Sequence, residues 1–302
     1  MLNMQQPFSG AGVALVTPFK NHDIDYPALK HIINFVIEGG VDFIVSLGTT
    51  GEAVTLTAKE CREVLDFTIE TTDNRVPIVA GYFGSNFTER LTANIRQYDF
   101  TGVAAIMSSS PAYTKPSQEG IFRHYMAVAE ASPRPIIIYN VPSRTGSNVL
   151  PETVLRLAHE SAQFMAVKEA SGNLDQAMKI LKHRPDHLQV FCGEDPLTLP
   201  MIAGGGHGAI SVIANVFPAH FSGLVRAARE GNFDLARKLN FDLLDVHPWL
   251  YVEGNPVGIK AAMEIAGYCS KEVRIPLVEQ SESNYLKLQE AMSKVGAWDF
   301  AR

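Results

Sequence analysis

A lysine follows directly on an apolar run in the stretch Phe164 to Asn173, which reads Phe-Met-Ala-Val-Lys-Glu-Ala-Ser-Gly-Asn. If Phe164 to Val167 forms a buried strand, Lys168 lies at its C-terminal end, where burial disfavours the charged ammonium. A neutral amine is a nucleophile, and its natural chemistry is a Schiff base with a carbonyl compound. The simpler alternative is a strand-end lysine paired with a carboxylate such as Glu169. The surrounding sequence has to decide between the two.

Other polar side chains follow predicted strands in the same way. They are Thr17, Thr49, Thr50, Tyr113, Tyr139 and Arg144. Taken singly, Thr49 and Thr50 are also explained as part of a turn between glycines. Tyr139 is likewise explained as a core aromatic, and Arg144 as a solvated surface residue. If the strands close into a parallel barrel, however, their C-terminal ends meet at one rim, and the convergence favours a catalytic role for Lys168.

Eight short apolar runs recur along the first two-thirds of the chain, and each is followed by a helix-like amphipathic segment. The runs are Gly12 to Pro18, Phe43 to Gly48, Pro77 to Gly81, Val103 to Met107, Pro135 to Val141, Phe164 to Ala170, Gln189 to Gly193 and Gly208 to Ala214. They do not alternate polar with apolar residues, as expected of strands that are covered on both faces. Eight such units without a break predict an α/β fold, a closed (β/α)8 TIM barrel. No GxGxxG follows the first run, which disfavours a dinucleotide-binding sheet.

Helix start signals lie between these runs. Pro27 opens a helix near Tyr26 to Glu38, Thr57 to Glu60 forms a capping box, and others begin near Ser117 and Pro151. After Ala214 the character changes to helices alone, predicted at Phe217 to Glu230, Phe233 to Val246, Val257 to Ala266 and Ser283 to Val295. We expect a barrel domain over 1–230 and a C-terminal helical extension over 231–302. The extension either supports the barrel or builds a subunit interface.

Composition narrows the classes of partner. The 302 residues are 46% hydrophobic with a formal net charge of −6, which favours small solutes over nucleic acid or anionic membranes. Residues 1–7 show no leader pattern, and no apolar run approaches bilayer-spanning length. Three dispersed cysteines fit a reducing cytoplasm, and neither they nor the nine histidines have metal-ligand spacing.

Four blocks of residues carry a resemblance to a known family. They are Gly48 to Glu52 (GTTGE), Tyr139 to Gly146 (YNVPSRTG), Lys168 to Asn173 (KEASGN) and Gly205 to Ser211 (GGHGAIS). The chain resembles the class I aldolases of the dihydrodipicolinate synthase and N-acetylneuraminate lyase superfamily, and within it most of all the dihydrodipicolinate synthase family. The resemblance implies a lyase without metal or organic cofactor. Its substrates would be pyruvate and aspartate semialdehyde, and its product would enter diaminopimelate and lysine synthesis.

The resemblance also implies roles for four catalytic residues. Lys168 would form an imine with pyruvate, and the derived enamine would attack the aldehyde. Tyr139 would donate and accept protons, supported by a hydrogen-bonded relay through Thr50 and Tyr113. Family members place the tyrosine that corresponds to Tyr113 in a neighbouring subunit's site, which implies a homodimer or homotetramer.

Further positions correspond to substrate-binding residues of the family. Thr49, with the backbone around Thr50, would hold the pyruvate carboxylate. Arg144 would face the carboxylate of the aldehyde substrate, a task suited to a planar guanidinium. Gly193 and Ile210 match positions whose backbone carbonyls lie near the imine. Asp195 either borders the pocket or serves as a carboxylate at the N-terminus of a helix. The glycines between 204 and 208 either permit close backbone packing or cradle a phosphate.

One part of the family pattern is missing. In many bacterial members lysine inhibits at an interface that uses histidine, glutamate and a stacking tyrosine. Here Ala58, Cys61, Arg90 and Ala112 occupy the corresponding places. Feedback inhibition by lysine is therefore expected to be weak or absent, because the cation would lose its carboxylate partner and meet Arg90.

Other functions remain open on the sequence. N-acetylneuraminate lyase and 2-keto-3-deoxy sugar acid aldolases share the lysine and tyrosine but take a different aldehyde; Thr50, Arg144 and Tyr113 argue against them. A ligand-binding barrel without catalysis and a pyridoxal phosphate barrel, which also needs a strand-end lysine, are alternatives of other classes.

Overall fold

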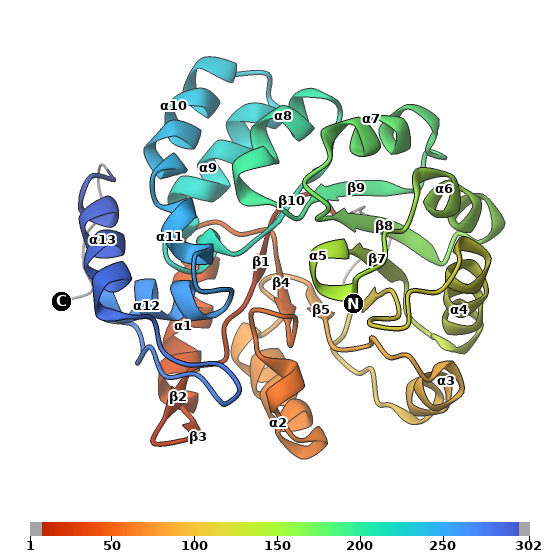
Figure 1. Ribbon diagram of the computed structural model, residues 1–302, viewed down its shortest axis with the longest axis horizontal. Helices are drawn as coiled ribbons and strands as arrows, with labels where there is room; N and C mark the ends of the chain where they lie inside the picture. The colour runs from red at the N-terminus through yellow and green to blue at the C-terminus, as the bar shows by residue number, and fades with distance from the viewer. Residues whose placement is uncertain (1–7, 296–302) are drawn as a thin grey trace.

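A closed parallel barrel forms the centre of the molecule, as the computed structural model of residues 8–295 shows (Figure 1). Its strands are β1 (Gly10–Ala14), β4 (Phe43–Ser46), β5 (Ile78–Ala80), β6 (Ala105–Ser109), β7 (Ile136–Asn140), β8 (Phe164–Glu169), β9 (Gln189–Cys192) and β10 (Gly208–Ser211). Each pairs with its neighbours in chain order, and β1 closes the ring between β4 and β10. The predicted (β/α)8 TIM barrel is confirmed. Residues 1–7, for which no leader pattern was expected, lie outside the described range.

Helices surround the strands and continue beyond them (Figure 1). Those of the barrel are α1 (Tyr26–Glu38), α2 (Ala58–Thr72), α3 (Thr88–Gln97), α4 (Gln118–Ala131), α5 (Pro142–Thr145), α6 (Pro151–Glu160), α7 (Leu174–His183), α8 (Thr198–Ala203) and α9 (Pro218–Arg229). The C-terminal ones are α10 (Phe233–Leu244), α11 (His247–Tyr251), α12 (Val257–Ile265) and α13 (Glu282–Ser293). Short 3-10 turns are η1 (Ala53–Thr55), η2 (Asp195–Leu197) and η3 (Ile213–Asn215). Across residues 8–295 no helix has the length and apolarity to cross a membrane.

The two faces of each barrel strand contact different surroundings. On β7, Ile137 and Tyr139 point into the barrel interior, whereas Ile136 and Ile138 pack against the surrounding helices. Successive side chains of a strand point to opposite faces, so both faces of this strand are apolar because both are covered. The strand runs in the sequence lack a polar–apolar alternation because the barrel strands are covered on both faces, as expected.

The first strand differs from its prediction. Gly12 to Pro18 was expected, but β1 ends at Ala14 because the chain then leaves the barrel wall, and the backbone N–H of Val16 donates to the side-chain oxygen of Asn215 (3.1 Å). The following residues form a small hairpin, β2 (Phe19–Lys20) with β3 (Asp23–Ile24), which the sequence did not predict.

Gly208 has the close-packing role that was one of the two interpretations of the glycines between 204 and 208. A Cβ at this position would lie 1.9 Å from the carbonyl oxygen of Gly10, and its φ of +147° also favours glycine. The residue therefore allows β10 to approach β1 closely, which is the packing role.

Of the C-terminal helices, α12 lies beside α1 at the blue end of the colour range, whereas α10 packs against α9 (Figure 1). Tyr268, which follows α12, stacks on Phe35 of α1 with ring centroids 4.2 Å apart. The predicted boundary between residues 230 and 231 falls between α9 and α10. The division into two domains at that point stays a prediction.

A buried ion pair ties the C-terminal helices to the barrel. The Lys260 ammonium on α12 contacts the Glu52 carboxylate, which lies in the turn after β4, and both side chains are almost completely buried. Lys260 Nζ also donates to the backbone carbonyl of Glu272 (2.9 Å) and lies 3.8 Å from the ring centroid of Phe19. Burial lowers the pKa of Lys260, and the charge of Glu52 opposes that shift. The pair thus holds the turn after β4 against the extension.

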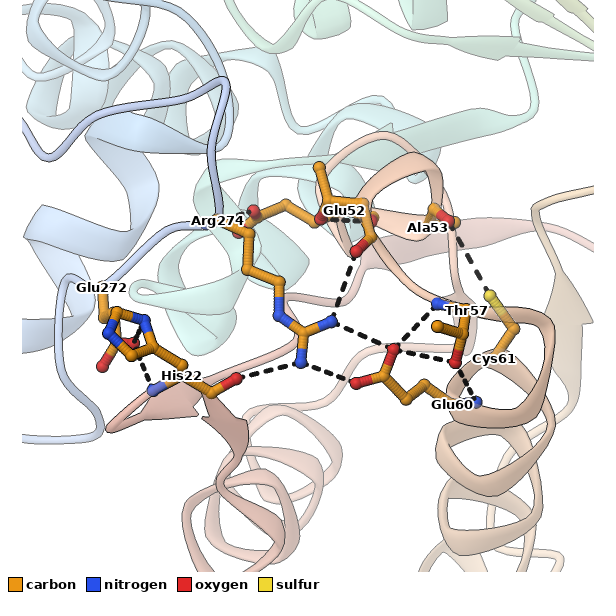
Figure 2. Close-up of polar contacts among 9 residues, drawn as sticks. His22, Glu52, Ala53, Thr57, Glu60, Cys61, Glu272 and Arg274 are labelled. Carbon is orange, nitrogen blue, oxygen red and sulfur yellow. Dashed lines mark hydrogen bonds and ion pairs between the residues drawn. The ribbon is translucent and has the colours of Figure 1, made fainter.

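Arg274 makes a second connection in the same region, drawn in Figure 2. Its guanidinium donates to Glu60 at 2.6 and 3.0 Å, to the carbonyl of Thr55 at 3.3 Å and to the carbonyl of His22 at 3.0 Å. Glu60 also accepts from the backbone N–H of Thr57 (2.8 Å), which confirms the predicted capping box at the start of α2. The hydrogen bond from Arg274 lowers the pKa of Glu60 to about 2. One arginine therefore joins the hairpin, the turn after β4 and α2.

Replacing Lys260 by methionine is expected to lower the free energy of unfolding by about 3–5 kcal/mol, because Glu52 would remain buried without its cation. Urea denaturation monitored by circular dichroism measures the change. Lys294→Met, which breaks an exposed pair with Glu290 on the surface of α13, is the control and should leave stability unchanged within error. Equal effects of the two substitutions would contradict the assignment of Lys260 as a structural anchor.

Candidate active site

A cavity of about 110 Å³ opens at the C-terminal ends of the barrel strands. Its lining residues are Ala14, Gly48, Thr49, Thr50, Met107, Tyr139, Val141, Ser143, Arg144, Lys168, Ala170, Gly193, Glu194, Val212, Tyr251 and Asn255. The structure thus brings six of the predicted site residues to one place, namely Thr49, Thr50, Tyr139, Arg144, Lys168 and Gly193. They come from the ends of four strands, β4, β7, β8 and β9, as expected of a site at this rim.

Lys168 and Tyr139 form the centre of the cavity. They are register partners on the adjacent strands β8 and β7, and Lys168 Nζ lies 4.6 Å from the centroid of the Tyr139 ring. Their side chains are 4% and 8% exposed. The amine can act as a nucleophile and the phenol beside it as a proton donor, so the two groups that imine formation needs are adjacent.

Glu169 does not pair with Lys168, so the simpler interpretation of the lysine is wrong. Its carboxylate lies on the opposite face of β8, where it accepts from Asn140 Nδ2 (2.9 Å), Gln176 Nε2 (2.8 Å) and the backbone N–H of Ser171 (2.7 Å). Neutral donors therefore satisfy this carboxylate outside the barrel interior. Within residues 8–295 no carboxylate lies within ion-pair distance of Lys168 Nζ.

The threonine turn is held in an uncommon backbone conformation. Leu47 and Glu52, on either side of Thr49 and Thr50, have φ of +61° and +53°. Residues other than glycine rarely adopt such angles, and they persist only where surrounding contacts fix them. Thr17 provides one such contact, since its hydroxyl donates to the carbonyl of Gly51 (2.7 Å). Thr50 is 2% exposed, so its hydroxyl is available only to groups in or beside the cavity.

Arg144 lies on the one-turn helix α5. The helix begins at Pro142, whose fixed φ suits a first helical position, and ends at Gly146 with a φ of +73°. The guanidinium is exposed and donates through Nη2 to the backbone carbonyl of Asn255 (3.1 Å). Arg144 is therefore positioned by the C-terminal extension while it faces the cavity.

Tyr113 and Ile210 do not line this cavity. Tyr113 is 90% exposed with a φ of +67°, and its backbone N–H donates to the carbonyl of Thr145 (2.9 Å). Ile210 is fully buried on β10, and its side chain packs within the barrel interior. Only a backbone role was expected of Ile210, and that role stays a prediction.

Three polar lining residues lie outside the four sequence blocks and were not predicted. Glu194 directly follows Gly193, a signal that the sequence contained; Tyr251 and Asn255 come from the extension and belong to none of the four blocks. Burial, and then the charge of Asp195, raise the pKa of Glu194, whereas Lys168 and Arg144 oppose the shift. A carboxylate thus shares the cavity with the side chains of Lys168 and Arg144.

Asp195 has a structural role. It begins η2, but its Oδ2 accepts from the backbone N–H groups of Val212 (3.0 Å) and Ile213 (2.8 Å), after β10. It therefore joins the loops after β9 and β10 and does not line the cavity. Across residues 8–295 there is no group of three or more His, Cys, Asp or Glu side chains that could hold a metal ion.

The geometry agrees with sequence comparison. The model of the dihydrodipicolinate synthetase family matches residues 7–295. The chain belongs to this family. Among its relatives, the 4-hydroxy-tetrahydrodipicolinate synthases of Cytophaga hutchinsonii and Flavobacterium psychrophilum are 44% and 45% identical to it. The alignments cover 95% and 94% of this chain and 97% of each relative.

Solved structures of this family share the fold. The dihydrodipicolinate synthase of Aquifex aeolicus is 40% identical, with a TM-score of 0.91 over 95% of this chain and 98% of that one. The Thermotoga maritima enzyme is 34% identical, with a TM-score of 0.93 over 96% and 99%. Another similar structure, with a TM-score of 0.93, 34% identity and coverage of 96% and 97%, is described as a monomeric dihydrodipicolinate synthase variant.

Proposed function

We propose that this dihydrodipicolinate synthase family member condenses pyruvate with aspartate 4-semialdehyde to give 4-hydroxy-tetrahydrodipicolinate. The observation that carries the proposal is the buried pair of Lys168 and Tyr139, in register at the end of adjacent strands and facing Arg144 across one cavity. The names of its relatives give the product, and the family resemblance of the four sequence blocks implies the two substrates. The activity is that of a lyase that works through a Schiff base and needs no cofactor.

The reaction begins with the neutral amine of Lys168. Its nitrogen attacks the keto carbon of pyruvate, and loss of water gives a protonated imine. The imine withdraws electrons from the adjacent methyl group, so that a proton leaves and an enamine forms. Thr49 and the backbone of the turn hold the pyruvate carboxylate through neutral donors, with the carbonyls of Gly193 and Ile210 near the imine.

The enamine carbon then attacks the aldehyde carbon, and the aldehyde oxygen takes up a proton. The amino group of the aldehyde substrate attacks the imine carbon in turn and displaces Lys168, which closes the ring and frees the enzyme. Arg144 holds the carboxylate of this substrate, because its planar guanidinium matches two carboxylate oxygens.

Tyr139 moves protons at both stages, and Thr50 passes them onward. The third member of the relay, Tyr113, is exposed in the single chain, and this exposure supports a role in the cavity of a neighbouring copy. The working assembly is accordingly a homodimer, or a homotetramer built from two such dimers. Its place is the cytoplasm, which suits the free thiols of Cys61, Cys192 and Cys269.

Glu194 completes the recognition of the aldehyde substrate. Aspartate semialdehyde carries an ammonium as well as a carboxylate. Glu194 and Arg144 both line the cavity, so that the cavity offers one negative and one positive side chain. The ammonium of the substrate thus faces Glu194, and its carboxylate faces Arg144. This arrangement disfavours aldehydes that lack an ammonium, including the sugar aldehydes of related lyases.

Borohydride reduction in the presence of pyruvate tests the function. We expect a mass increase located at Lys168 by peptide mapping, and we expect aspartate semialdehyde to reduce the trapping because turnover competes with it. Lys168→Arg should not be labelled, whereas Lys179→Arg, on the exposed surface of α7, should be labelled as the unaltered protein is. Trapping that a sugar aldehyde relieves, and aspartate semialdehyde does not, would assign a different aldehyde; no trapping would refute the imine.

Glu194→Gln is expected to raise the KM for aspartate semialdehyde at least about 10-fold, because a charge-assisted contact to the ammonium is lost. The KM for pyruvate should stay unchanged. In the unaltered enzyme the same KM should rise as the pH falls through the raised pKa of Glu194, since protonation removes its charge; the variant should lack this rise. Steady-state kinetics at several pH values measure both effects, with the exposed Glu230→Gln as control. An equal rise in both KM values would contradict the assignment.

L-lysine is expected to inhibit weakly or not at all. Cys61 is buried with its Sγ 3.8 Å from the carbonyl of Ala53, and Arg90 is exposed where family members carry a glutamate. A lysine ligand would meet a like charge at Arg90 and find no imidazole at Ala58. Initial rates over a range of lysine concentrations measure the effect, and Arg90→Glu should increase sensitivity. Half-inhibition at sub-millimolar lysine would refute the prediction.

A further inference from the structure

Tyr251 brings a phenol hydroxyl from the C-terminal extension to the wall of the cavity. It is the last residue of α11, and it lines the cavity together with Lys168, Arg144 and Glu194. Its ring packs against the hydrophobic core. Its hydroxyl makes no hydrogen bond within residues 8–295, and it is not enclosed by protein atoms. Core packing therefore accounts for the ring, whereas the hydroxyl is available to a molecule bound in the cavity.

The segment that carries Tyr251 is held in place by the residues that follow it. Gly258 of α12 lies so close to Leu250 that a Cβ at Gly258 would be 2.4 Å from the Leu250 carbonyl oxygen. Gln280 Nε2 donates to the backbone carbonyl of Trp249 at 2.8 Å. These contacts fix the backbone from which the phenol projects. A donor that is already in position loses less conformational freedom when a ligand binds.

The same segment contacts Arg144. The backbone carbonyl of Asn255, four residues after Tyr251, accepts from Arg144 Nη2 at 3.1 Å. Residues 251–255 thus present the phenol and also hold the guanidinium at the cavity. A group that binds Arg144 in the cavity therefore comes near this segment of the extension.

The phenol is a neutral donor in these surroundings. Burial, followed by the charges of Asp195 and Glu194, raises the pKa of Tyr251 well above its usual value, and the charge of Arg144 opposes the shift. The hydroxyl therefore keeps its hydrogen in neutral solution. It has no protein acceptor, although the carboxylate of Glu194 lines the same cavity.

A bound carboxylate needs more donors than Arg144 supplies. A carboxylate has several acceptor lone pairs on its two oxygens, and a bidentate guanidinium fills only part of them. Arg144 also uses one hydrogen of Nη2 on the Asn255 carbonyl. Acceptor sites that stay unpaired in a water-poor cavity weaken binding. A neutral phenol beside the guanidinium fills a further site without adding charge.

We propose that Tyr251 is a specificity-determining residue that donates its phenol hydrogen to the carboxylate of the aldehyde substrate, beside Arg144. The proposal deepens the proposed function and rests on it, because it concerns the binding of the same aldehyde. It assigns the C-terminal extension a direct contact with substrate, in addition to its structural anchors at Lys260 and Arg274.

Tyr251→Phe removes the hydroxyl and keeps the ring. We expect the KM for aspartate semialdehyde to rise about 10-fold, because a hydrogen bond to a charged group is lost. The KM for pyruvate should stay unchanged within error. The melting temperature should also be unchanged, because the hydroxyl has no protein partner. Tyr285→Phe, on α13 and outside the cavity lining, is the control and should leave both KM values unchanged.

Two shortened aldehydes identify the group that the phenol contacts. Succinate semialdehyde has the carboxylate of the substrate but no ammonium, whereas 3-aminopropanal has the ammonium but no carboxylate. Each is measured as a competitive inhibitor against aspartate semialdehyde. Tyr251→Phe should raise the inhibition constant of succinate semialdehyde about 10-fold and leave that of 3-aminopropanal unchanged. Equal increases for both inhibitors, or an increase for 3-aminopropanal alone, would overturn the assignment.

The outcomes separate this proposal from the proposed function. If aspartate semialdehyde relieves the trapping of pyruvate on Lys168 but Tyr251→Phe keeps the kinetics of the unaltered enzyme, the role of Tyr251 is refuted and the function stands. If Tyr251→Phe loses activity only in proportion to a lower melting temperature, the residue is structural and the proposal is again refuted. A failure to trap pyruvate on the unaltered protein would instead refute the proposed function.

Discussion

The parallel register between β7 and β8 places Tyr139 beside Lys168, and the rest of the site depends on it. Strand side chains alternate between faces, so a slip of one residue would turn Lys168 toward the helices and Glu169 into the barrel. Three hydrogen bonds to Glu169, from Asn140, Gln176 and the backbone of Ser171, oppose such a slip. The carboxylate next to the lysine in sequence therefore fixes which face the lysine occupies.

A second constraint comes from the far end of the chain. The turn after β4 carries Thr49 and Thr50 in a conformation that residues other than glycine rarely adopt, and contacts must hold it there. Lys260 binds the buried Glu52, and Arg274 donates both to the carbonyl of Thr55 and to Glu60. Figure 2 shows Arg274 between Glu60 and His22. The helices that follow the barrel therefore fix the geometry of a turn that lies about two hundred residues earlier.

Local sequence patterns made the barrel strands and several residues of the candidate site predictable. Each barrel strand is a short apolar run, and the strand-end residues Lys168, Tyr139, Thr50 and Arg144 belong to blocks that can be read within a few positions. Asn255 and Tyr251 could not be found in this way, because their relation to the cavity arises from packing over long sequence separations. The two-strand hairpin and the early end of β1 also depend on distant partners, among them Asn215.

Lys260 and Asn255, two polar residues of the extension, differ in the partners that surround them. The ammonium of Lys260 is buried with Glu52, the carbonyl of Glu272 and the ring of Phe19 as partners. The oxygen of Asn255 is enclosed without any among the described residues. A buried charge with several partners is accounted for by the fold that it holds together, since removing one partner would be costly. The Asn255 amide instead donates to the Thr50 hydroxyl, and its backbone carbonyl accepts from Arg144, so its contacts join the extension to residues that line the cavity. Two residues that are close in sequence thus make different connections: Lys260 holds the turn after β4 through Glu52, whereas Asn255 contacts residues that line the cavity.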